Sequence, residues 1–213
     1  MIAARFSSRA DLDHLRSQLI RQRQENKTII TVCSGTGCQA CGCLDVTAAF
    51  KEVLRQSSLD QEVEVRATGC HGFCERGPLV VIKPEGIFYQ RVRPSDVKLI
   101  VDQTIKGGKL VNRLLYRDPQ TKETVVYEKD VPFYKKQMRL ILGKNGFMDP
   151  TSINDFIALG GYQALSKALT AMKPDEIIEE VKKAVNSLPK KQRTMLILYK
   201  YEEIENYINI YRK

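Results

Sequence analysis

The chain has 213 residues, of which 43% are hydrophobic and 28% charged, and its formal net charge is +9. This composition argues against long disorder and coiled-coil rods. Without a run of roughly 20 apolar residues or a signal peptide, we expect no direct membrane insertion and a cytoplasmic location. The positive charge lies mostly at the two ends, because residues 1–27 and 185–213 each hold six Lys or Arg against three Asp or Glu, so we expect no nucleic-acid partner.

The first half of the chain predicts an α/β domain. Leu12, Leu15 and Leu19 form one apolar stripe, as in an amphipathic helix. The β-branched run from Thr28 to Val32 is typical of a buried strand. In chain order, the predicted elements are a helix over 8–25, a strand over 28–32, a helix over 44–57, a strand over 62–66, a hairpin over 79–92 and a helix over 95–106. A β-α-β unit followed by a hairpin and a helix is the thioredoxin-like arrangement.

The pattern changes after Gly107-Gly108. The following stretch is polar and contains Asp118-Pro119, which predicts a connector. From Pro132 onward the pattern predicts mostly helix. The predicted division is a thioredoxin-like domain over 1–110, a linker over 111–131, an incomplete and mainly helical domain over 132–184, and a divergent tail over 185–213.

Six cysteines lie between positions 33 and 74, and the rest of the chain has none. Cys33 and Cys38 have the spacing C-x4-C, and Cys70 and Cys74 have the spacing C-x3-C. Each pair follows a predicted strand, and successive parallel strands end at the same edge of a sheet. We therefore expect the four thiols to converge, in loops whose glycines let backbone N–H groups approach sulfur.

Two pairs of thiolates suit a 2Fe-2S cluster, with one pair for each iron. Zinc in a four-cysteine site is the alternative, although its ligands usually have the tighter C-x2-C spacing. Disulfides or free thiols also stay open. Cys41 and Cys43 are expected to be incidental, although Cys38 and Cys41 have a C-x2-C spacing that would suit zinc, and His71 is expected outside the ligand set. No catalytic motif or nucleotide-binding loop is identified, so no catalytic or organic-cofactor residue is predicted.

Two segments carry a resemblance to a known family. VCSGTGCQACG and TGCHGFCERGPLVVIKPEGIFYQRV resemble the thioredoxin-like 2Fe-2S ferredoxin domain. More narrowly, they look like the version fused to the NADH-binding flavoprotein subunit of complex I relatives, including NADH-dependent, electron-bifurcating hydrogenases and formate dehydrogenases. EKDVPFYKKQMRLILGKNGFMDPTSINDFIALGGYQALSKAL looks like the start of that flavoprotein subunit. The resemblance implies that Cys33, Cys38, Cys70 and Cys74 bind a 2Fe-2S cluster.

The C-terminal part departs from this resemblance. The family continues into a glycine-rich loop for FMN and NADH and then into cysteines for a 4Fe-4S cluster, whereas this chain has no glycine after Gly161 and no cysteine after Cys74. FMN, NAD and 4Fe-4S are therefore expected only in a full-length family member, and this chain is expected to be truncated or to carry a foreign tail. Whether it is an enzyme by itself stays open.

Three functions compete at this point. The resemblance favours an electron-transfer subunit, or a fragment of one, that passes single electrons among the other subunits of a multi-subunit NADH-linked oxidoreductase. A stand-alone ferredoxin-like carrier is the second hypothesis. A zinc-stabilised interaction module without redox activity is the third.

Overall fold

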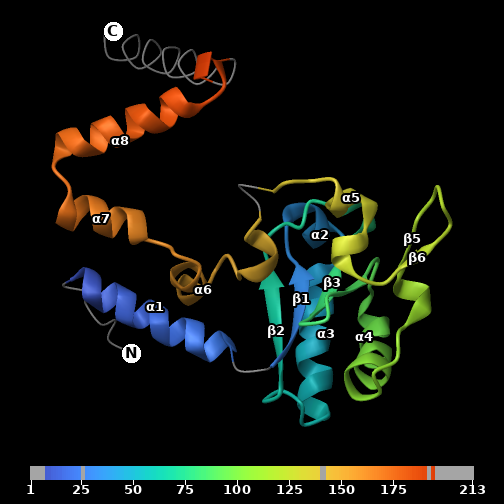
Figure 1. The fold of residues 1–213 in the computed structure, drawn as a ribbon. Coiled ribbons are helices and arrows are strands. Elements are labelled where there is room, and N and C mark those ends of the chain that lie inside the picture. The colour runs from blue at the N-terminus through green and yellow to red at the C-terminus, as the bar shows by residue number, and fades with distance from the viewer. Residues whose placement is uncertain (1–7, 25–26, 140–142, 191–192, 195–213) are drawn as a thin grey trace, which may run out of the picture. The chain divides into compact units, whose positions relative to one another are not determined.

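The computed structural model describes residues 8–24, 27–139, 143–190 and 193–194 (Figure 1). The chain forms two compact units. One comprises Ala10–Gly161, and the other comprises Met1–Arg9 with Tyr162–Lys213. Most of the tail predicted over 185–213 lies outside the described residues.

The unit Ala10–Gly161 is built on a four-stranded sheet with the strand order β2-β1-β3-β4. β1 and β2 are parallel, whereas β3 pairs antiparallel with both β1 and β4. The strands are β1 (Thr28–Cys33), β2 (Val63–Thr68), β3 (Val80–Lys83) and β4 (Ile87–Tyr89). These pairings confirm the predicted β-α-β unit and hairpin.

The helices of this unit confirm the predicted positions within a few residues. They are α1 (Arg9–Gln24), α2 (Thr36–Ala40), α3 (Cys43–Gln56) and α4 (Pro94–Ile100), which continues as the π-helical η2 (Val101–Lys106). α3 connects β1 to β2 and packs beside α4 (Figure 1). The short α2 was not predicted.

The core lies between the sheet and these helices. β1 and β3 supply Ile30, Val32 and Val81, which are fully buried, and α3 supplies Phe50. Full burial of such a side chain contributes about 1.5–3 kcal/mol. The burial therefore fixes the register of β1 and, with it, the position of the cysteine that ends this strand.

Residues after α4 also pack on the sheet. The backbone N–H of Phe88 donates to Val126 O at 2.8 Å, and that of Gln90 donates to Leu114 O at 2.9 Å. The Tyr89 hydroxyl accepts from the backbone N–H of Val111 at 3.0 Å. The elements of this region are η3 (Asn112–Leu114), β5 (Tyr116–Arg117), β6 (Thr124–Val125), η4 (Glu128–Asp130), α5 (Pro132–Lys135), η5 (Asn145–Phe147) and α6 (Ile153–Ala158). The stretch 111–131, predicted as a linker, lies within this packed region.

The second unit contains two described helices, α7 (Gln163–Ala171) and α8 (Pro174–Ser187). Lys167 Nζ on α7 lies 3.1 Å from a carboxylate oxygen of Glu180 on α8. Together with α6, these helices bear out the mainly helical character predicted for this region. Among the described residues, no helix has the length and apolar character needed to cross a membrane.

Candidate metal centre

The two cysteine-bearing segments leave the sheet at the same end, as the sequence predicts. β1 ends at Cys33, β2 ends at Thr68, and these two residues are paired in the parallel register. Cys38 lies in α2, and Cys74 begins the 3-10 helix η1 (Cys74–Arg76). The parallel register therefore places the start of the first cysteine segment beside the start of the second.

Three glycines show how closely the two segments approach each other. A Cβ added to Gly35 would lie 2.8 Å from Cys70 Cβ, and one added to Gly37 would lie 3.1 Å from Cys74 Sγ. A Cβ added to Gly77 would lie 2.7 Å from Cys38 Sγ. Each glycine thus faces a cysteine of the opposite pair, and the loops interlock in a way that only residues without a side chain permit.

The four thiols form two pairs. Cys70 Sγ lies 3.9 Å from Cys74 Sγ. In the other pair, the interaction between the Cys33 and Cys38 thiols lowers the pKa of Cys33 and raises that of Cys38. A thiolate is the form that binds a metal, so a lowered pKa at Cys33 favours metal binding.

Backbone N–H groups point at the sulfur atoms. The N–H of His71 donates to Cys33 Sγ at 3.5 Å, and that of Gly72 donates to Cys70 Sγ at 3.3 Å. Such hydrogen bonds stabilise negative charge on sulfur and set the reduction potential of a bound cluster. Gly72 adopts a φ of 89°, a left-handed conformation that favours glycine.

The site has an inner side and an outer side. Cys33 and Cys38 are fully buried, Cys70 is half-buried and Cys74 is exposed. A group held by all four thiols would therefore lie close to the surface on the side of the second pair. Proximity to the surface is what electron exchange with another protein requires.

The donor set fits a 2Fe-2S cluster, which needs two thiolates for each iron and backbone donors around its sulfur atoms. Gly35, Gly37 and Gly77 let the two loops approach each other closely enough for all four thiols to face one group. Among the described residues, no group of three or more Cys, His, Asp or Glu side chains has an arrangement that could hold a single metal ion. Two separate pairs, which the structure does contain, are the arrangement that a two-iron cluster requires.

Cys41 and Cys43 lie in different surroundings. Cys43 begins α3 and is fully buried, and burial raises the pKa of its thiol. Cys41 is exposed beyond the end of α2. All six cysteines are free thiols. Neither of these two residues was predicted as a ligand, and that interpretation stays a prediction.

His71 lies inside the second cysteine segment and is 1% exposed. Its Nε2 is 2.8 Å from Thr68 Oγ1, and its Nδ1 is 3.1 Å from a carboxylate oxygen of Glu128. Burial by itself would raise the pKa of Glu128, but the hydrogen bond with His71 and the charges of Lys83 and Arg139 lower it below its ordinary value. The imidazole thus joins the cysteine segment to a residue of η4.

Two further residues support the same segment from a distance along the chain. The Phe133 ring stacks on Phe73 with 4.5 Å between ring centroids, and Arg139 donates to the backbone carbonyl of His71 at 3.1 Å. Glu128, Phe133 and Arg139 were not predicted as parts of this site. No local pattern identifies them, because their partners lie about 60 residues earlier in the chain.

Known proteins share these features. Residues 18–105 match the thioredoxin-like 2Fe-2S ferredoxin family. The 2Fe-2S ferredoxin of Clostridium pasteurianum is 40% identical over 77 residues, which are 36% of this chain and 76% of that protein. The 2Fe-2S ferredoxin of Aquifex aeolicus is 38% identical over 79 residues, which are 37% of this chain and 71% of that protein.

A third relative is much longer than this chain. The NADP-reducing hydrogenase subunit HndC of Solidesulfovibrio fructosivorans is 50% identical over 50 residues, which are 24% of this chain but only 10% of that protein. The paired thiols, the sheet that carries them and the match to most of the length of two ferredoxins lead to one assignment. The chain belongs to the thioredoxin-like 2Fe-2S ferredoxin family, whose members carry a 2Fe-2S cluster, and it is a ferredoxin-like electron carrier.

Proposed function

We propose that Cys33, Cys38, Cys70 and Cys74 bind the 2Fe-2S cluster, with one pair of thiolates on each iron. The observation that carries this assignment is the interlocking of the two segments, in which Gly35 and Gly37 of the first face Cys70 and Cys74 of the second. When bound, the cluster would take up and release one electron at a time. The chain's own residues supply the ligands and the N–H donors, and they bury the inner pair away from water.

We further propose that this carrier works within an NADH-linked oxidoreductase, next to other subunits of a multi-subunit redox complex. The similarity to HndC supports a role beside an enzyme that uses a nicotinamide cofactor, because HndC is named as a subunit of an NADP-reducing hydrogenase. The segment 128–169, which resembles the start of a flavoprotein subunit, supports it from the sequence. A hydrogenase, a formate dehydrogenase and a quinone reductase would each need such a carrier.

A stand-alone electron carrier is the second candidate function. The relatives from Clostridium pasteurianum and Aquifex aeolicus are named as ferredoxins, and this chain covers 76% and 71% of their lengths. The two candidates differ in what surrounds the chain. Purification under native conditions separates them, since a complex would bring further subunits and flavin with it and a free carrier would not.

The ligand assignment is tested by anaerobic reconstitution of the full chain and of single Cys→Ser variants. Iron, inorganic sulfide and the electron paramagnetic resonance signal of the reduced protein are measured. We expect two irons and two sulfides per chain, and loss or strong perturbation of the signal when Cys33, Cys38, Cys70 or Cys74 is replaced. Cys41→Ser is the matched control and should keep the cluster. Loss of the cluster in Cys41→Ser but not in Cys33→Ser would contradict the assignment, and a colourless protein with one zinc ion would contradict the function.

A further inference from the structure

Two neighbouring hollows on the unit Ala10–Gly161 share a basic lining. The first has a volume of about 340 Å³ and includes Arg91, Arg93 and Arg113 among its lining residues. The second has a volume of about 400 Å³ and again includes Arg91 and Arg93. Because the same two arginines line both, the hollows are adjacent parts of one basic groove.

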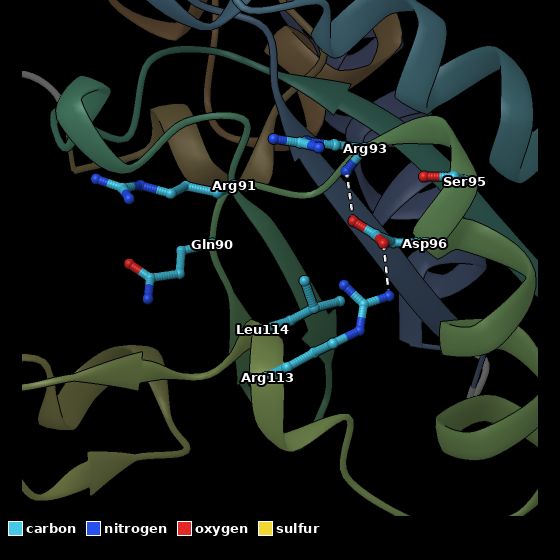
Figure 2. Close-up of a pocket in the computed structure, with 7 residues that line it drawn as sticks. All are labelled: Gln90, Arg91, Arg93, Ser95, Asp96, Arg113 and Leu114. Atoms are coloured by element: carbon cyan, nitrogen blue, oxygen red, sulfur yellow. Dashed lines mark hydrogen bonds and ion pairs between the residues drawn. The ribbon is translucent and has the colours of Figure 1, made fainter.

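The arginines differ in how their charge is used. Arg113 lies 2.6 Å from Asp96 Oδ1, and Asp96 Oδ2 accepts the backbone N–H of Arg93 at 2.8 Å (Figure 2). The carboxylate of Asp96, which is 5% exposed, is thus fully engaged. Within the described part of the chain, the guanidinium groups of Arg91 and Arg93 have no hydrogen-bond or ion-pair partner, and both residues are exposed. Figure 2 shows these two side chains extending in the same direction from the segment that precedes α4.

The backbone that carries these arginines is held in place. Arg91 has a φ of 51°, a left-handed conformation that is uncommon for a residue with a side chain. Its N–H donates to Arg76 O at 2.9 Å, and the N–H of Val92 donates to Pro78 O at 3.2 Å. The two free guanidinium groups therefore sit on a segment whose shape is fixed by the loop that follows Cys74.

The groove adjoins the candidate metal centre. Its second hollow is lined by Gly77, the residue whose added Cβ would lie 2.7 Å from Cys38 Sγ. Cys41 and Asp45 line the same hollow. A molecule bound to Arg91 and Arg93 would thus be separated from the proposed ligand Cys38 by Gly77. The Asp45 carboxylate would limit how far the negative charge of that molecule extends into the hollow.

We propose that this groove is the docking site for a carboxylate-rich segment of the protein with which the chain exchanges electrons. The inference rests on the proposed electron-carrier function. Two free guanidinium groups select negatively charged oxygen atoms, and a planar guanidinium matches the geometry of a carboxylate. Two adjoining hollows offer more length than a single free oxyanion fills, which favours an extended acidic segment. Complementary charge next to a redox centre speeds association and orients the partner.

The probe for this proposal is a fluorescein-labelled oligoglutamate peptide, and its binding to the reconstituted full chain is measured by fluorescence anisotropy. An oligoglutamine peptide of equal length is the uncharged control. We expect the double variant Arg91→Gln/Arg93→Gln to weaken binding of oligoglutamate about tenfold. Raising the salt from about 0.05 M to about 0.3 M should weaken binding to the unmodified chain much more than to this variant.

Two further variants make the result specific. Arg21→Gln/Lys51→Gln removes the same number of charges from exposed residues that line neither hollow, and it should change the Kd less than about twofold. Arg91→Lys/Arg93→Lys keeps the charge but loses the planar guanidinium groups, so it should bind more tightly than the glutamine variant and more weakly than the unmodified chain. The visible absorbance of the cluster and the circular dichroism of each variant show that it is folded, and the metal content tests the electron-carrier function separately from the binding.

Equal losses in Arg91→Gln/Arg93→Gln and in the remote variant would show a general charge effect and would overturn the proposal. Displacement of the peptide by an equal concentration of inorganic phosphate would assign the groove to a free oxyanion and would also overturn it. Equal binding of oligoglutamine would have the same consequence. Selective loss in the Arg91→Gln/Arg93→Gln variant, with partial recovery in the lysine variant, supports an acidic partner.

Discussion

The interlocked glycines allow a test of the site that changes no proposed ligand. Gly35 has φ −63° and ψ 159°, which alanine adopts without strain, so Gly35→Ala adds only one methyl group. That group would lie 2.8 Å from Cys70 Cβ and 3.1 Å from Cys70 Cα and Sγ. Because two of these atoms are close to the backbone, rotation of the cysteine side chain cannot relieve the contact.

The size of the effect follows from these distances. To restore an ordinary contact of 3.4 Å, the two segments must separate by about 0.6 Å. Metal–ligand distances tolerate about 0.2 Å. The displacement is therefore too large for all four thiolates to keep their bonds, and overpacking of this kind costs about 1–3 kcal/mol in unfolding free energy. We expect Gly35→Ala to lose most of its iron and sulfide after anaerobic reconstitution.

Gly108→Ala is the control for a general loss of stability. Gly108 has a φ of 62°, so alanine there strains the backbone, yet nothing lies within 4 Å of the added Cβ. This variant should lose about 1 kcal/mol of stability but keep its full content of iron and sulfide. If Gly35→Ala instead binds the cluster with unchanged stoichiometry and an unchanged resonance spectrum, the close approach of Gly35 to Cys70 is not a feature of the loaded protein, and the reasoning fails.

Three other predictions concern different parts of the chain. Burial lowers the pKa of Lys83 from 10.5 to about 8, so between these pH values the folded state binds fewer protons than the unfolded state. The unfolding free energy of the wild type should therefore rise from pH 8 to pH 10.5, as measured by urea denaturation with Lys83→Met as the reference. The sequence predicts that 1–110 is a complete domain, but residues 111–134 pack on its sheet. We therefore expect a protein of residues 1–161 to unfold at a clearly higher temperature than one of residues 1–110. Equal melting temperatures would favour the boundary near residue 110. Since no glycine follows Gly161 to bring backbone close to a pyrophosphate, the purified chain should not reduce a dye with NADH and FMN above the free-flavin rate, and turnover with FMN bound near one per chain would contradict this.

The sequence predicted the parts of the fold that depend on local pattern. The strand from Thr28, the helix that follows and the strand near Val65 all have clear periodicity, and each occurs in the structure within a few residues. Their order predicts the parallel pairing, and this pairing brings Cys33 and Cys70 to one end of the sheet. Short polar loops that connect elements of clear periodicity can follow few paths, which is why the convergence of the cysteine segments was predictable.

The parts that could not be predicted depend on contacts between distant residues. Val111, Leu115 and Val131 are buried, but the apolar residues around them form only short runs, and the polar residues between these runs predict a linker. His71 was expected at the surface or beside the ligands, and only the structure shows that Glu128, 57 residues later, holds its ring. A hydrogen bond between two residues so far apart leaves no local signal, because each partner alone is an ordinary polar residue in the sequence.

The support that His71 and Phe73 receive from later residues has a consequence for how the protein is made. All four proposed ligands are synthesised by residue 74, whereas Glu128, Phe133 and Arg139 follow 54 to 65 residues later. At the usual speed of a ribosome, this gap lasts about 3–13 s. During that time the nascent chain presents Cys70 and Cys74 on a segment that lacks its stacked ring, its carboxylate and its guanidinium partner. We therefore expect delivery of iron and sulfide to be productive only after residue 139 has left the ribosome, so that nascent chains arrested before this point bind the cluster poorly.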